Sequence, residues 1–318
     1  MNSLDTPILF IIFNRPDVTA RVFETIKHAR PKSLFIAADG PRSTHPKDSE
    51  LCEQTRAIVS EIDWPCDVRT KFNAKNLGCK YAVSSAISWF FQHVDSGIIL
   101  EDDCLPDTSF FSFCENLLKY YQNDARVMHI AGCNFQNGIR RSNADYYFSI
   151  YAHVWGWATW KRAWAQYDVN MRDFSSETNK AFIRRISKNL HFQRYWNELF
   201  LKTSKGQIDT WDYQWQYAIW KSSGLCVIPQ VNLIANIGFG AEATHTQHDS
   251  WLADLPVSPL KIENFSQTVA QNAEADKYTG TNVFGLRLSV RSYLTWLLKY
   301  LAQKLIRTCA RLLPHGGK

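Results

Sequence analysis

The stretch "SGIILEDDCLPDTSFFSF", residues 96–113, decides how the rest of the chain is interpreted. Its apolar run, typical of a buried strand, leads directly into Glu101, Asp102 and Asp103. Three adjacent carboxylates repel one another, so a cation or hydrogen-bond donors must offset their charge. Mg²⁺ and Mn²⁺ prefer oxygen ligands and commonly bridge one or two carboxylates to phosphates. The stretch therefore predicts a divalent-metal site at a strand end. The alternative is a solvated acidic turn in which Asp107 caps the next helix.

The sequence before this stretch alternates between strands and helices. Apolar strands are predicted at 7–13, 33–39 and 97–100, a weakly alternating strand at 67–73, and helices at 17–29, 48–61, 79–94 and 107–122. This order of elements predicts an α/β fold with a mostly parallel central sheet and helices on both faces. Ligands of such sheets bind at the carboxyl ends of the strands. Asn14, Arg15 and Asp39 follow the first two strands, so we expect them to lie beside the acidic residues.

The later part of the chain is less regular. Strands are predicted at 127–133, 146–151 and 225–230, one long helix at 177–203, a helix at 211–224 and a glycine-rich loop at 236–247. Between them lies "HVWGWATWKRAW", which is crowded with aromatic rings. Such rings serve either as core or as flat faces for a sugar.

Charge and cysteine content exclude several classes of protein. The formal net charge is +6, but residues 286–318 carry seven basic and no acidic residues, which leaves about −1 (6 − 7) for the rest. A neutral domain with a cationic end is not expected to bind nucleic acid. None of the eight cysteines forms a CxxC pair, which argues against a zinc site. The first apolar run lacks a preceding basic region, so we expect a cytoplasmic protein and not a secreted one.

The cationic end, residues 284–318, has leucines at helical spacing among its basic residues. Its longest uncharged run is seven residues, Ser292 to Leu298, too short to span a bilayer. We expect an amphipathic helical tail that lies on an anionic membrane, which suits an enzyme on the inner face of the cell membrane. The alternative is a helix whose apolar stripe docks on the domain.

The segment "EDDCLPDTSFFSF" resembles the metal motif of GT-A glycosyltransferases, and its layout is similar to that of the N-acetylglucosaminyltransferase I family or of a bacterial family 2-like relative. Shorter segments resemble that family in the same order, over roughly residues 5 to 250: "PILFIIFNRP", "FIAADG", "HVWGWATW", "WDYQW" and "GFGAEATH". The resemblance implies a GT-A, Rossmann-like fold. Residues 1–125 would then form the nucleotide-sugar-binding half, and 126–270 the acceptor and catalytic-base half of the same domain.

The resemblance also implies roles for individual residues. Asp103 would be the ligand of Mn²⁺ or Mg²⁺, and Asp212 the catalytic base. The acceptor side would include His153, Trp155, Trp157 and His245. The donor would be bound by Asn14, Arg15, Asp39, Glu101, Asp102 and Trp211. Asn76 and Lys80, in "KNLGCK", stand where the family has a histidine near the uracil, which leaves the base open although a UDP-sugar is favoured.

The expected function is therefore a metal-dependent, inverting transfer of a sugar from a nucleotide-diphosphate donor to a glycan or lipid-linked acceptor. Alternatively, Asp212 has only a structural role, in which its negative charge stabilises a helix N-terminus. Two other classes stay open. One is a metal-dependent nucleotidyltransferase or hydrolase on a similar fold, although no glycine-rich loop follows the first strand. The other is a noncatalytic glycan-binding protein.

Overall fold

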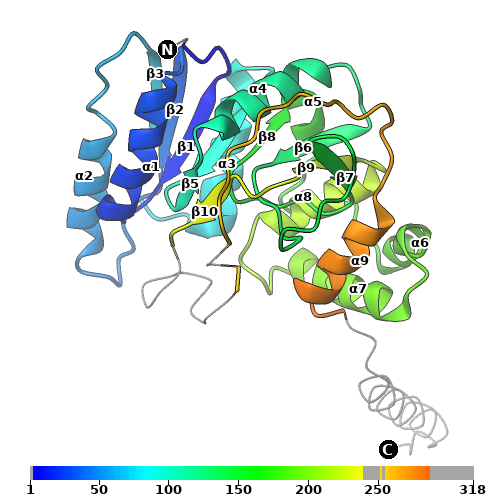
Figure 1. The fold of residues 1–318 in the computed structure, drawn as a ribbon. Helices are drawn as coiled ribbons and strands as arrows, with labels where there is room; N and C mark the ends of the chain where they lie inside the picture. Colours follow the sequence, from blue (N-terminus) through cyan, green and yellow to red (C-terminus); the bar gives the residue numbers. More distant parts are fainter. Residues whose placement is uncertain (1–2, 239–250, 253–254, 287–318) are drawn as a thin grey trace, which may run out of the picture.

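The computed structural model describes residues 3–238, 251–252 and 255–286. Its centre is a twisted eight-stranded sheet with helices on both faces (Figure 1). In sheet order the strands are β3 (Asp67–Phe72), β2 (Ser33–Ala38), β1 (Ile8–Ile12), β4 (Ser96–Glu101), β8 (Trp157–Trp160), β6 (Val127–Ala131), β9 (Leu225–Pro229) and β7 (Tyr146–Ser149). Only β8 and β7 run antiparallel to their neighbours. The predicted mostly parallel α/β sheet is confirmed.

Alternate residues of the central strands enter two separate cores. Phe10 and Ile98 face one core and Leu9 and Ile99 the other, and all four are fully buried. The first core is covered by α1 (Pro16–Ala29), α2 (Asp48–Ile58) and α4 (Ser109–Tyr120). The second is covered by α3 (Gly78–His93), α5 (Lys161–Trp164), α7 (Leu190–Ser204) and α8 (Asp212–Lys221). Burial on both faces explains why the central strands β1, β2 and β4 are almost continuously apolar.

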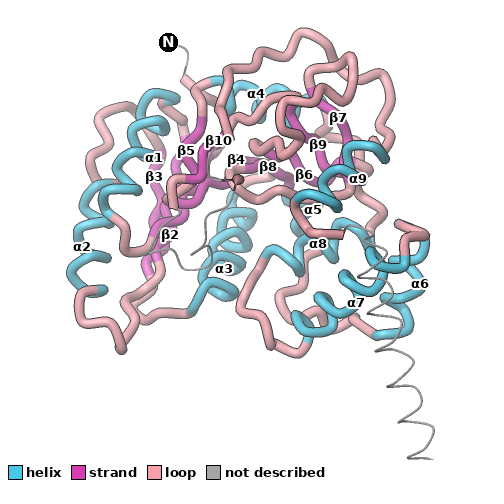
Figure 2. The backbone as a smooth tube through the Cα atoms, turned by 60° about the horizontal axis from the view of Figure 1, so that its bottom comes forward, coloured by secondary structure: helices cyan, strands magenta, loops and turns pink. Residues whose placement is uncertain are grey.

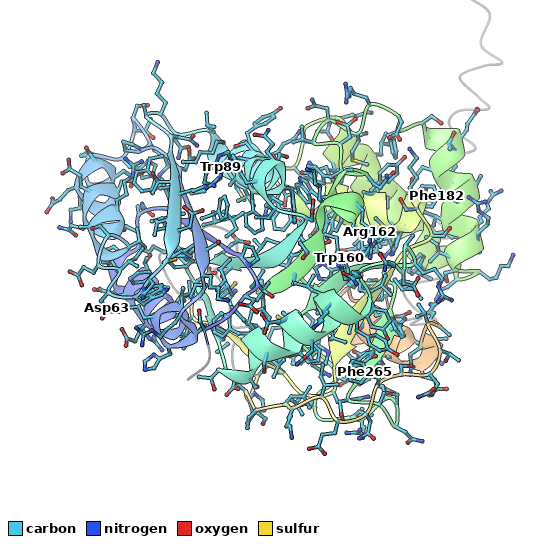
Figure 3. All side chains as sticks on the ribbon, turned by 90° about the horizontal axis from the view of Figure 1, so that it is seen from above. Asp63, Trp89, Trp160, Arg162, Phe182 and Phe265 are labelled. Carbon is cyan, nitrogen blue, oxygen red and sulfur yellow. The ribbon has the colours of Figure 1, made fainter. Side chains whose placement is uncertain are left out.

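The antiparallel strand β8 was not expected from the sequence. It forms from "WATW" within the ring-crowded segment and lies between β4 and β6, so it joins the early and late parts of the chain in one sheet. Trp157 points into the second core and is fully buried. On the opposite side of the strand, the Trp160 ring lies under the Arg162 guanidinium at 4.3 Å (Figure 3).

The predicted single helix at 177–203 is wrong, because the chain breaks into α6 (Ser176–Ile186) and α7. The Asn189 side chain accepts hydrogen bonds from the backbone N–H groups of His191 and Phe192 and so begins a new helix. The tube in Figure 2 shows α6 and α7 as separate helices at one end of the molecule.

The remaining described elements are a second, two-stranded sheet and a last helix. β10 (Ile234–Asn236) pairs antiparallel with β5 (Cys104–Pro106), and α9 (Ala273–Asn282) packs near β7. Among the helices within the described ranges, none is long and apolar enough to cross a membrane. Most of the predicted tail, from residue 287 on, lies outside the described residues, as does the glycine-rich loop from residue 239 on.

Candidate active site

The carboxyl ends of three neighbouring parallel strands bring the predicted polar residues to one edge of the sheet. Ile12 of β1 is in register with Ala38 of β2, and Ile11 with Glu101 of β4. Arg15 and Asp39, which follow these strand ends, therefore reach the same edge as the acidic residues. This is the position at which open α/β sheets bind ligands.

The Glu101–Asp103 cluster already has one cation inside the protein. The Nη2 group of Arg15 donates to Oδ1 of Asp102 and, at 3.1 Å, to Oδ2 of Asp103. Asp102 is buried, whereas Asp103 is partly exposed. The second oxygen of Asp102, Oδ2, is buried without a hydrogen-bond partner among the described residues. Arg15 therefore offsets part of the repulsion and leaves one buried acceptor unsatisfied.

Burial and mutual repulsion disfavour full ionisation of the cluster. Burial raises the pKa of Asp102 to about 6, although the charge of Arg15 opposes the shift. Burial, followed by the charges of Asp103 and Asp102, raises the pKa of Glu101 to about 8. Although burial opposes it, the same carboxylates raise the pKa of Arg15, which stays charged. The cluster holds more negative charge than Arg15 neutralises, so a further cation would lower its free energy.

Asp39, in contrast, is fully hydrogen-bonded by its own chain. Its two oxygens accept bonds from five groups, namely Gly40 N at 2.9 Å, Asn73 Nδ2 at 3.0 Å, Asn76 Nδ2 at 3.0 Å, Leu77 N at 3.0 Å and Gly78 N at 3.2 Å. The carboxylate thus binds the first turn of α3, where helices leave N–H groups unpaired. Asn76, a predicted donor-binding residue, is tied to Asp39 and to the Gly40 carbonyl. Both residues shape the loop before α3.

Asn14 also has a partner that the sequence did not reveal. Its Nδ2 donates to Oδ1 of the buried Asp48 at 2.9 Å, and Arg42 Nε donates to Asp48 Oδ2 at 2.6 Å. The hydrogen bonds from Arg42 lower the pKa of Asp48 to about 2. Asp48 was predicted only as the start of a helix, and nothing in its local sequence indicates a contact with the end of β1.

Asp212, the predicted base, lies at the start of α8 and receives a hydrogen bond from the Thr210 hydroxyl. It is close enough to Glu101 for its charge to contribute to the raised pKa of that residue. A second acid, Asp209, was missed at the sequence level. Its oxygens lie near the start of α3, with Oδ1 at 3.4 Å from Lys80 N.

The acids converge around Cys79 in the first turn of α3. Burial raises the pKa of this thiol, and the charges of Glu101, Asp212, Asp209 and Asp39 raise it further. Four carboxylates, from the ends of β2 and β4 and from the segment 209–212 that leads into α8, therefore lie within electrostatic range of one residue. The predicted base Asp212 therefore lies near two of the predicted donor-binding acids, Glu101 and Asp39.

The predicted sugar contact Trp211, the predicted acceptor-side Trp157 and the predicted donor-binding Lys80 are all buried. Trp211 is buried, and its ring stacks on Trp157 with centroids 5.6 Å apart. This packing places both indoles in the core and not at a ligand surface. Lys80 is also buried, with its ammonium group 5.2 Å from the centre of the Tyr81 ring.

The acceptor-side residues divide into buried, partly exposed and undescribed. His153 is buried against Phe135 at 4.4 Å, and burial lowers its pKa to about 3, so it is neutral. Trp155 is partly exposed and meets the same Phe135 edge-on at 5.4 Å. His245 lies outside the described residues.

The chain approaches the acidic cluster again after β10. Ile237 N donates to the Asp103 carbonyl at 2.8 Å. A Cβ atom at Gly238 would collide with Asp103 Oδ2 and lie 2.8 Å from Arg15 Nη1. A side chain at this position would have to displace both groups, so the start of the glycine-rich loop passes close to Asp103.

The cluster suits a metal ion that is shared with a ligand. Within the described part of the chain, no group of three His, Cys, Asp or Glu side chains is arranged to hold a metal ion on its own. Mg²⁺ and Mn²⁺ in phosphate sites need only one or two carboxylates, because phosphates and waters complete the coordination shell. The partly exposed Asp103 and the unpartnered Oδ2 of Asp102 fit that requirement.

Comparisons with known proteins find likenesses of fold alone. No family model and no curated protein matches the chain. A mannosyltransferase from Pyrobaculum calidifontis in complex with GDP-Man and Mn²⁺ is 10% identical, with a TM-score of 0.38 over 68% of this chain and 70% of its own. A UTP-bound UGPase from Acinetobacter baumannii is 8% identical, with a TM-score of 0.35 over 73% of this chain and 88% of its own. These values are too low for any residue role or activity to be transferred.

Proposed function

We propose that this protein is a glycosyltransferase that moves a sugar from a nucleotide-diphosphate donor, with UDP favoured, to a glycan or lipid-linked acceptor. The observation that carries the proposal is the convergence of Arg15, the Glu101–Asp103 cluster and Asp212 at one sheet edge. Such a transfer needs a cation at the diphosphate and a base at the acceptor hydroxyl, and the site offers groups for both.

Each of these groups has a distinct task in the proposal. Asp103, oriented by Arg15, and the unpartnered oxygen of Asp102 would hold Mn²⁺ or Mg²⁺. When bound, the ion supplies a Lewis acid for the charge on the leaving diphosphate. Asp212 would accept the proton of the acceptor hydroxyl, held in place by its hydrogen bond from Thr210. A carboxylate base of this kind implies inversion at the sugar carbon.

The loops around the site would select the donor. Asp39 and Asn76 rigidify residues 73–78, which lie at the end of β2 where a base would bind. The backbone at Gly238 passes close to Asp103 and would shield this side of the diphosphate from water. In this proposal Asp39 acts by shaping the loop, because its oxygens are already occupied.

The decisive experiment measures UDP and GDP binding with and without Mn²⁺, by calorimetry. We expect binding that depends on Mn²⁺ in the wild-type protein and that is lost in Asp103→Asn. The matched control is Asp107→Asn, four residues along the same connection, where the carboxylate bonds Ser109 N at 2.8 Å and is expected to leave binding unchanged. Equal binding without the metal would refute the metal-dependent mechanism.

A product assay separates the open classes. A panel of UDP- and GDP-sugars with a lipid-linked glycan acceptor should release nucleotide only when the acceptor is present. Release without an acceptor would indicate a hydrolase, and pyrophosphate release from UTP and a sugar 1-phosphate would indicate a nucleotidyltransferase. Glycan binding with no turnover of any donor would indicate a noncatalytic protein.

A further inference from the structure

The exposed face of α6 carries positive charges that form no ion pair within the described part of the chain. Lys180, Arg184 and Arg185 are exposed on this helix. Phe182, labelled in Figure 3, and Ile183 belong to its buried face. The last two cations belong to the final turn, where they complement the helix dipole. No ion pair joins any of them to another residue in the described ranges, and α6 has a single acid, Glu177.

The link between α6 and α7 extends this surface. Lys188 is exposed in the link, and Leu190 begins α7 with 58% of its surface exposed. Of the large apolar side chains in the described residues, Leu190 is the most exposed. Cations around an exposed leucine are typical of surfaces that lie on anionic membranes, because the leucine enters the interface while the cations meet the head groups. A nucleic acid would use the cations and not the leucine.

The chain also leaves the described structure at this helix pair. Phe284 packs on Trp196 of α7 with ring centroids 5.2 Å apart, and Leu286 N donates to the Gly280 carbonyl at 2.8 Å. The residues after Leu286 include seven basic and no acidic side chains. The cationic sequence after Leu286 therefore continues from a point of the chain that packs on α7.

We propose that the exposed face of α6 and the start of α7, formed by Lys180, Arg184, Arg185, Lys188 and Leu190, docks the protein on an anionic lipid bilayer. The surface is separate from the candidate active site, since none of its residues contributes to that site. Docking needs neither donor nor turnover, so the inference stands whether or not the proposed transfer is correct. If the transfer is correct, docking would bring the enzyme to a lipid-linked acceptor.

The experiment measures partition of the full chain onto phosphatidylcholine vesicles with and without phosphatidylglycerol. We expect binding only to the anionic vesicles, with loss of binding in about 1 M salt, where charges are screened beyond ~3 Å. Each cation near such a surface contributes about 5-fold in affinity. Arg184→Gln with Arg185→Gln should therefore bind about 25-fold more weakly. Leu190→Ser should also weaken binding.

The control removes two cations elsewhere. Arg21 of α1 and Lys119 of α4 are exposed, and Lys119 is in a last helical turn like Arg184 and Arg185. Arg21→Gln with Lys119→Gln should bind vesicles as the wild type does. All these positions are exposed, so thermal unfolding should be unchanged in each variant.

Three results would overturn the inference. One is unchanged vesicle binding by the α6 variant, because then residues after 286 bind the membrane alone. Another is equal binding to neutral vesicles. The third is salt-sensitive binding of a short RNA that the α6 variant loses, with no binding to vesicles, which would assign the face to nucleic acid.

Discussion

Asp39 and the Glu101–Asp103 cluster lie at the same sheet edge, but their carboxylates differ in how far the protein's own hydrogen bonds satisfy them. Asp39 receives bonds from five donors of its own chain. The Glu101–Asp103 cluster receives Arg15 and leaves an oxygen of Asp102 buried without a partner in the described structure. A carboxylate that is satisfied on folding contributes to stability, whereas an unsatisfied one costs stability unless a ligand compensates it. The comparison therefore separates residues that build the site from residues that act in it.

The largest effect is expected where the proposed chemistry depends on one carboxylate. Asp212→Asn keeps the shape of the side chain but removes its basicity. Transfer activity should fall by about 10²- to 10⁴-fold, with little change in nucleotide binding. The measurement is steady-state kcat against calorimetric Kd for the same donor. A variant that keeps wild-type kcat would show that Asp212 only stabilises the start of α8.

The next effect concerns stability and not activity. Asp39→Ala leaves several partly buried donors at the start of α3, including Leu77 N and Gly78 N, without their shared acceptor. The free energy of unfolding should fall by about 3 kcal/mol, as measured by urea denaturation. Asp39→Asn retains one acceptor oxygen and should lose less. If both variants are as stable as the wild type but fail to bind nucleotide, Asp39 belongs to the acting group.

The Glu101 carboxyl gives a pH-dependent test of the same distinction. Because its pKa is raised to about 8, the folded state binds the proton more tightly than the unfolded state, so its contribution to stability is full below about pH 4 and is lost as pH rises toward 8. The free energy of unfolding of Glu101→Gln, relative to that of the wild type, should therefore rise between pH 5 and pH 8. The rise should be on the order of 2 kcal/mol, since Glu101 is only partly buried. Urea denaturation at both pH values measures the difference. A constant offset would contradict the raised pKa.

The sequence predicted the sheet and the edge better than it predicted individual contacts. The strand ends near Arg15, Asp39 and Glu101 are recognisable because apolar runs end there in polar residues. Parallel strands then bring those ends to one edge of the sheet. The pairing of Asn14 with Asp48, and the approach of Asp209 to α3, depend on loops that meet only in the folded chain. The burial of Trp157 follows from strand β8, whose four residues are too few to show a period of two.

The smallest effect separates two aspartates that are four residues apart. Asp107 accepts hydrogen bonds from Ser109 N at 2.8 Å and from the Ser109 hydroxyl at 2.5 Å, so it stabilises the first turn of α4. Asp107→Ala should lower the free energy of unfolding by about 1 kcal/mol, the usual value of a lost cap, and leave nucleotide binding intact. Asp103→Ala should do the reverse, because among the described residues its Oδ2 accepts a hydrogen bond from Arg15 alone and its removal relieves repulsion within the cluster. Urea denaturation and calorimetry on the same two variants check both halves. If Asp103→Ala unfolds more easily and still binds nucleotide with Mn²⁺, the carboxylate that follows Asp102 is structural, and the distinction between the two groups fails at its central residue.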